Sequence, residues 1–162
     1  MAGTGSTLDR GDVYFKGTAA GKHLGVTNCT FVGTARQDSF KVAAGTADFY
    51  RCTFADAAEG YGLRVLGGKA TVKDSIIWGN ALGGVKLDDT GLADVTSTDT
   101  QDETEGIGNM AEDPLFAEGG WGHLQSEAGY YTAGFTGGVW AVAETTSPAI
   151  DRGDVNGDLG LE

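Results

Sequence analysis

The chain has 162 residues and a net charge of −12 at neutral pH, with 28 glycines and only 2 prolines. This length suits one domain with a single core. No run of about 18 apolar residues is present, which excludes a membrane-spanning helix, and the acidic balance argues against nucleic acid as a partner because phosphate binding needs a cationic surface. Many glycines with few prolines are typical of short strands joined by tight turns.

Residues 1–22 are expected to form an N-terminal cap or irregular first turn. Val13 and Phe15 alternate with Tyr14 as in a strand, and the sequence before them is rich in glycine. This segment lacks the basic and apolar regions of a signal peptide. If the natural protein is secreted, we expect the chain to be an excised fragment.

The stretch 23–91 contains three consecutive copies of a 23-residue repeat, in which Val26, Phe49 and Val72 occupy equivalent positions. Each copy has three pairs of apolar residues two positions apart, which is the periodicity of a strand. In the first copy these pairs are Leu24/Val26, Cys29/Phe31 and Phe40/Val42. A short repeat of short strands predicts an all-β solenoid with three strands in each rung.

The corners between the first two strands of each rung carry Asn28, Arg51 and Asp74. We expect a left-handed backbone there, which Asn and Asp tolerate better than most residues. The third strand slips by one residue in the last copy, because Val85 follows Leu63 by 22 residues instead of 23. A shortened loop of this kind leaves the core of a solenoid undisturbed.

Regular rungs are expected over 23–112, with Ile107 returning to an inward position. From Asp113 the period is lost, so we expect an irregular C-terminal turn or cap over 113–162, with Trp140 as a lid on the core. A solenoid must cover its open end to avoid aggregation. The whole coil is expected to have six or seven rungs and a length of roughly 30 Å at about 4.8 Å for each rung.

Several motifs resemble the right-handed parallel β-helix repeats of bacterial surface and secreted proteins, in the pectate-lyase-like class. They are N-C-T-F at 28–31, R-C-T-F at 51–54, D-S-I-I-W-G-N at 74–80, D-P-L-F at 113–116 and S-P-A-I-D-R-G-D at 147–154. The resemblance implies a right-handed parallel β-helix and an extracellular or bacterial cell-surface location. It specifies function poorly, because this fold hosts polysaccharide lyases, glycosidases, adhesins and inert stalks. Relatives usually continue after the last motif, which implies that the chain is truncated.

One outward-facing residue of the third strand is basic in each rung, and together these residues predict a ladder of Lys41, Arg64 and Lys86 with Tyr14 at its head. Like charges on adjacent strands are destabilising, so the ladder needs an explanation. One interpretation is a groove that binds an acidic polysaccharide.

The alternative is that nearby acids neutralise the ladder and keep the strands soluble. The candidate acids are Asp38, Glu59, Asp88 and Asp89. Surface ion pairs of this kind are common and contribute little to stability.

No catalytic residue can be assigned firmly, and the candidates are Arg64, Lys86, Asp88 and Asp89. In lyases of similar fold, an outer Arg or Lys can act as the base. Paired carboxylates can perform acid and base work in glycosidases, but adjacent strand residues face opposite ways, and Asp-Asp-Thr-Gly is also an ordinary turn. The Gly-His-Gly of polygalacturonase-like sites is absent.

A calcium site is expected in the acidic half of the chain. Asp154, Asn156 and Asp158 place oxygen ligands at alternate positions, as at the start of a calcium loop, and Asp151 could complete a site. The pattern departs from that of a dockerin or EF-hand, because Leu159 stands where glycine is required.

Two further features leave alternatives open. Trp78, Trp121 and Trp140 could stack on sugar rings or cover the core, and the cover is favoured for Trp140, whereas the two interpretations are even for Trp121, between glycines. Cys29 and Cys52 lie one rung apart, at a spacing that tolerates a disulfide, but neighbouring residues in register point the same way, which favours two packed thiols.

The charges are distributed unevenly along the chain. Residues 1–87 carry a balance of +3, whereas residues 88–162 carry −15. In a solenoid this asymmetry lies along the axis and could steer head-to-tail contact. We therefore expect a non-catalytic adhesive or structural module that stacks on other β-helix modules. The alternative is a carbohydrate-active module that binds or cleaves an acidic polysaccharide.

Overall fold

In the computed structural model the described residues form strands and turns and no helix. The structure describes residues 13–17, 21–33, 37–118, 122–132 and 138–154. Its strands stack in parallel as a β-solenoid of about 4 turns, about 23 residues apart. This confirms the expected fold class. Within the described ranges, no helix has the length and apolar character of a membrane span.

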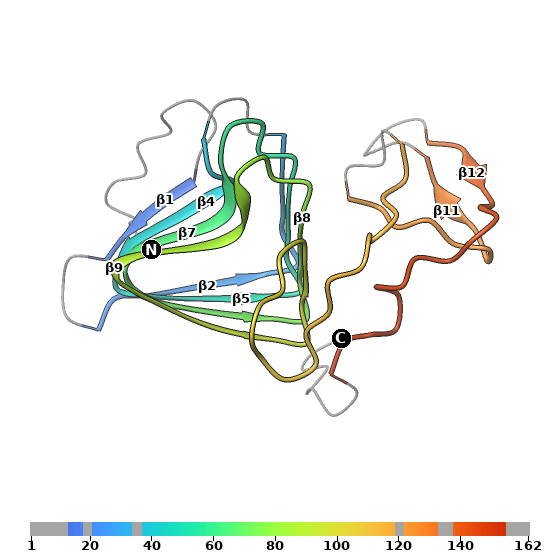
Figure 1. Ribbon diagram of the computed structural model, residues 1–162. Coiled ribbons are helices and arrows are strands. Elements are labelled where there is room, and N and C mark those ends of the chain that lie inside the picture. The colour runs from blue at the N-terminus through green and yellow to red at the C-terminus, as the bar shows by residue number, and fades with distance from the viewer. Residues whose placement is uncertain (1–12, 18–20, 34–36, 119–121, 133–137, 155–162) are drawn as a thin grey trace.

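Each turn has three strands, and the strands of successive turns stack into three faces around a triangular interior (Figure 1). The first face contains β1 (Val13–Lys16), β4 (Phe40–Ala44) and the first halves of β7 (Tyr61–Lys73) and β9 (Gly83–Thr96). The second face contains β2 (His23–Thr27), β5 (Thr46–Tyr50) and the second halves of β7 and β9. The third face contains β3 (Thr30–Val32), β6 (Thr53–Ala55), β8 (Ile76–Trp78) and β10 (Asp99–Thr100).

The strand register follows the repeat. Phe40 of β4 lies beside Leu63 of β7, and Leu63 lies beside Val85 of β9, which confirms the predicted one-residue slip. An irregularity in β7 between Val65 and Gly67 absorbs the missing residue before the second face begins. The slip is therefore confined to the first face.

The corners between the second and third faces have the predicted left-handed backbone. The φ angles of Asn28, Arg51 and Asp74 are 54°, 52° and 49°, and Ser97 continues the row with 47°. This conformation costs a non-glycine residue roughly 1–2 kcal/mol. Hydrogen bonds between turns stabilise the corner, as between the N–H of Asn28 and the carbonyl of Tyr50 at 3.0 Å.

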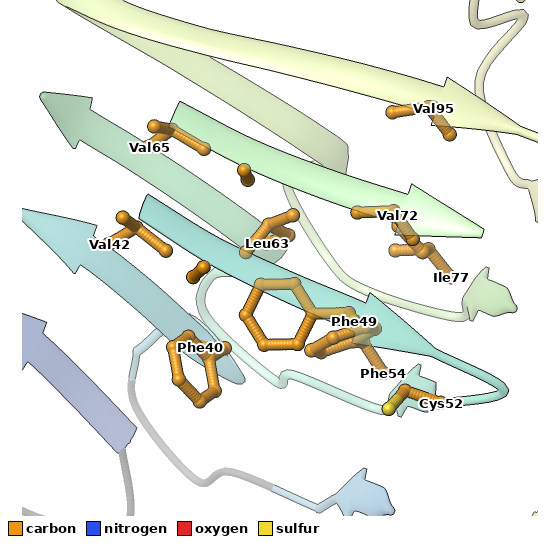
Figure 2. Packing of buried hydrophobic residues seen from close by; sticks show 12 residues of the cluster. Phe40, Val42, Phe49, Cys52, Phe54, Leu63, Val65, Val72, Ile77 and Val95 are labelled. Atoms are coloured by element: carbon orange, nitrogen blue, oxygen red, sulfur yellow. The ribbon is translucent and has the colours of Figure 1, made fainter. Parts of the chain in front are cut away.

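The core fills the space between the three faces. Phe40, Phe49 and Phe54, one from each face, meet edge to face with centroid distances of 4.8 Å and 5.2 Å, as Figure 2 shows. Burial of each such ring stabilises the fold by about 1.5–3 kcal/mol. The remaining buried members of this cluster are Val42, Ala47, Cys52, Leu63, Val65, Ala70, Val72, Ile77 and Val95.

A polar row lies next to the corners, where Cys29, Cys52, Ser75 and Thr98 follow one another at the repeat spacing. Each side chain donates a hydrogen bond to the carbonyl two residues before it, at 2.8–3.4 Å. Both cysteines are free thiols. The packed-thiol interpretation therefore describes this structure, and the disulfide does not.

The chain leaves the coil soon after Met110, which forms the last parallel bridge with Asp99. The expectation of six or seven rungs is therefore wrong, because the strands stack as only about 4 turns before the chain departs from the coil. The expected inward position of Ile107 is also wrong, since this residue is 86% exposed. Asn109 holds the loop instead, through a hydrogen bond from Nδ2 to the carbonyl of Val95 at 2.9 Å.

The C-terminal part contains a hairpin of β11 (Tyr130–Tyr131) and β12 (Trp140–Ala141), antiparallel to each other. It lies to the side of the third face, not over the end of the coil (Figure 1). The last described residues return to the coil, where the N–H of Asp154 donates to Asp74 Oδ1 at 2.7 Å.

Candidate functional site

The basic ladder predicted on the first face is present as a continuous row. Tyr14 lies beside Lys41, Lys41 beside Arg64, and Arg64 beside Lys86. These four residues are called the ladder below. Their arrangement follows from strand alternation, because each lies between two residues that point into the core.

Acidic side chains interleave with the ladder cations. Arg64 Nε donates to Asp88 Oδ2 at 2.6 Å and Arg64 Nη2 donates to Asp88 Oδ1 at 3.3 Å, which makes a two-pronged ion pair. Asp38 lies between two cations, with Oδ2 at 3.4 Å from Lys41 Nζ and 3.9 Å from Arg64 Nη1. The side chain of Asp38 is only 5% exposed, so this carboxylate is a buried, structural part of the first face.

The ion pair fixes the charge of both partners. The hydrogen bond with Asp88 raises the pKa of Arg64 above its ordinary value, and the hydrogen bond from Arg64 lowers the pKa of Asp88. A general base must give up its proton and a general acid must hold one near the working pH. The pair therefore moves both groups away from such roles.

The other acids named from the sequence contribute less. Asp89 and Glu59 are exposed, and in the described parts of the chain neither forms an ion pair with a ladder cation. Asp88 and Asp89 lie where the β7–β9 register shifts, and only Asp88 faces Arg64.

The residues of the expected calcium site are described only in part. Asn156 and Asp158 lie outside the described residues. Asp151 is exposed with a φ of 61°, while Asp154 Oδ2 lies 2.8 Å from Lys73 Nζ. Among the described residues no group of three or more His, Cys, Asp or Glu side chains could hold a metal ion. Calcium binding stays a prediction.

Aromatic residues give a second candidate surface, which includes one of the tryptophans that the sequence suggested for stacking on sugar rings. Trp121 lies outside the described residues. Trp140 and Tyr131 lie opposite each other on the hairpin, with centroids 5.2 Å apart and planes at 82°. They are 57% and 54% exposed, so Trp140 is not the expected lid.

Glycine at position 129 explains how Trp140 is held. A Cβ atom at Gly129 would lie 2.2 Å from Trp140 Cζ2, so the indole packs directly on the glycine backbone. The ring is thereby fixed on one side while more than half of it meets solvent. A glycine two residues before Tyr131 was the sequence signal for this packing.

One more ionisable group lies in an unusual environment. Asp99 is only 3% exposed, and its Oδ2 atom has no hydrogen-bond partner. It lines a cleft of about 90 Å³ between the last turn and the segment that contains Arg152. Burial, together with the nearby charges of Glu112 and Asp113, raises its pKa to about 6.

Comparison of the chain with protein-family models, with curated proteins and with solved structures finds no match.

Proposed function

We propose that the chain is a non-catalytic β-helix module of a secreted or surface-exposed bacterial protein of the pectate-lyase-like class, with a structural or adhesive role. The observation that carries the proposal is the two-pronged contact between Arg64 and Asp88. It occupies Arg64, the middle cation of the ladder and one of the two residues, with Lys86, that a lyase mechanism could use as a base.

The same contact gives the ladder a structural purpose. Stacked cations on adjacent strands repel one another, and the carboxylates of Asp38 and Asp88 relieve this repulsion from either side of Arg64. The ladder then resembles the solvated, charge-balanced face of a stalk.

Affinity electrophoresis tests the proposal directly. The protein is run through gels cast with acidic or neutral polysaccharides, with calcium present, and stained for cleared zones. We expect no clearing in any gel. Clearing by the wild-type chain that Arg64→Ala abolishes would contradict the proposal and make the ladder an active site.

Carbohydrate binding is the second candidate, and the exposed pair of Tyr131 and Trp140 favours it. A fixed, half-exposed indole offers a flat apolar surface on which the C–H groups of a sugar ring can pack. The same gels distinguish the hairpin surface from the ladder. If Trp140→Ala is no longer retarded while Arg64→Ala is retarded as the wild type is, the polysaccharide binds to the hairpin. The reverse result assigns an acidic polysaccharide to the ladder and to Lys86.

Calcium remains part of the proposal as a stabilising ion held by Asp151, Asp154, Asn156 and Asp158. A bound ion stabilises the folded state by mass action. A chelator is therefore expected to lower the melting temperature, and an unchanged value would remove calcium from the account.

A further inference from the structure

Among the described residues, no further strand stacks on β9 along the first and second faces of the coil. β9 pairs with β7 along one side, and in the described part of the chain no strand pairs with its other side over residues 83–94. The segment that follows the coil contacts this edge at its start, where the N–H of Gly84 donates to Asp102 Oδ2 at 2.6 Å, and again at the next corner, where the N–H of Ser97 donates to the carbonyl of Ile107 at 2.9 Å. An unpaired strand edge of this length is a template for another strand.

An apolar side chain marks the open end. Val42, Val65 and Leu87 lie in one inward-facing row, in which the two valines are 0% exposed and Leu87 is 45% exposed. Leu87 differs from the valines only in lacking a further turn beside it. One more turn would bury it as the valines are buried.

The first turn of the coil presents the matching surface. In the part of the chain that the structure describes, β1, β2 and β3 each have one strand neighbour, which is β4, β5 and β6 respectively. Phe15, Leu24 and Val26 of this turn pack against the core but are only partly buried. The first and last turns of the coil therefore have cross-sections of the same shape.

The charges at the two ends have opposite signs. Lys16 and Lys22 are exposed at the corner between the first and second faces of the first turn. Asp89 is exposed close to the same corner of the last turn, and Asp94 follows on the second face with a side chain 58% exposed. Asp94 continues the row of Gly25, so a further turn would bring the basic and acidic residues together.

We propose that the open end at β9 receives the first turn of a second copy of this chain, so that copies stack head to tail with β9 beside β1 and β2 of its neighbour. The inference rests on the proposed structural role. The contact is heterologous and does not close on itself, so it extends into open-ended chains of molecules. Opposite charges at the corner set the direction of stacking.

Sedimentation velocity of the full chain, over a range of protein concentrations in low and high salt, tests the proposal. The wild-type chain is expected to form dimers and longer species, with association weakening by about tenfold or more as salt screens the corner charges. Leu87→Lys places a charge in the contact and is expected to leave monomers. Val142→Lys, at a hairpin residue that is 65% exposed, is the matched control and is expected to assemble as the wild type does.

A charge exchange makes the test specific for head-to-tail contact. Lys16→Glu/Lys22→Glu and Asp89→Lys/Asp94→Lys are each expected to remain monomeric, because like charges then meet at the contact. An equimolar mixture of the two variants is expected to assemble again. The proposal is overturned if the wild type stays monomeric in every condition, if Leu87→Lys assembles, or if the mixture of the two charge variants does not assemble. The role as a non-catalytic module is tested separately by the polysaccharide gels, and it stands if these show no clearing.

Discussion

The side chain of Asn80 reaches the preceding turn of the coil, where its Oδ1 atom accepts a hydrogen bond from the backbone N–H of Ala57 at 3.1 Å. Its Nδ2 atom donates to the carbonyl of Phe54, also at 3.1 Å. Both Asn80 and Ala57 are almost completely buried. One amide therefore satisfies two backbone groups that water cannot reach.

Asn80→Ala is expected to destabilise the protein by about 1–3 kcal/mol, because it removes the side-chain hydrogen bonds to a buried N–H and to a buried carbonyl. The measurement is the free energy of unfolding in urea. Thr27→Ala, on an exposed side chain, is the control and should stay within about 0.5 kcal/mol of the wild type. Equal effects of the two substitutions would show that the amide bonds contribute no net stability.

The two thiols are expected to differ in reactivity. Cys52 is 1% exposed, and burial raises the pKa of its thiol, whereas Cys29 is only partly buried. Because the thiolate is the reactive form, a thiol-specific reagent should label Cys29 faster in the folded protein and both residues after unfolding. Cys52→Ser should keep the fast phase. Absence of free thiol after unfolding would indicate a disulfide and contradict the structure.

Removal of the neutralising carboxylate should convert the ladder into an anion-binding face. Asp88→Asn keeps the size of the side chain but removes the short ion pair of Arg64 and leaves only its longer contact of 3.9 Å with Asp38. Beside Lys41 and Lys86, the freed guanidinium presents three cations in a row. We expect this variant to be retarded more than the wild type in gels that contain an acidic polysaccharide, and not in neutral gels.

The control for this experiment is Asp89→Asn, which removes the same charge from a residue with no ion pair to the ladder in the described structure. It should migrate as the wild type does, apart from the small effect of its charge on mobility. Equal retardation of both variants would mean that net charge matters and the ladder does not.

The regular part of the coil could be predicted from the sequence because each rule acts locally. The 23-residue repeat places Asn28, Arg51 and Asp74 at equivalent positions, and each has the expected left-handed backbone. The slip at Val85 was visible as one missing residue. The register of the ladder residues followed from the alignment of the repeat copies, without any knowledge of long-range contacts.

The end of the coil could not be predicted in this way, because it depends on contacts between segments far apart in the sequence. Trp140 was expected to cover the core, as aromatic residues near an open end often do, but it packs on Gly129 in a separate hairpin. Ile107 has the apolar character of an inward residue, yet the polar contacts of Asn109 hold its loop across the corner. The positions of Trp140 and Ile107 are therefore determined by backbone shape and hydrogen bonds, and not by the apolar character of their side chains.

The burial of Asp99 also depends on a segment distant from its strand in sequence. Asp99 lies beside Ile76 in an outward-facing row, where a charged residue would ordinarily meet solvent. Here the chain around Glu112 folds over it, and the N–H of Glu112 donates to Asp99 Oδ1 at 3.3 Å. The other carboxylate oxygen stays buried without a partner.

The pKa of Asp99 is about 6 in the folded protein, above the ordinary value of 3.8. The folded state therefore binds the proton more tightly than the unfolded state does. Stability should fall as the pH rises from about 4 to about 6 and then level off, as far as this group is concerned. Asp99→Asn, which stays neutral, should be more stable than the wild type at pH 8 by up to about 3 kcal/mol, since each pKa unit corresponds to about 1.4 kcal/mol. At pH 4 the two proteins should differ little. Urea unfolding at both pH values measures the effect, and Asp89→Asn is the exposed control. If the wild type is at least as stable as Asp99→Asn at pH 8, the prediction is contradicted, and the Asp99 carboxylate has a stabilising partner in solution.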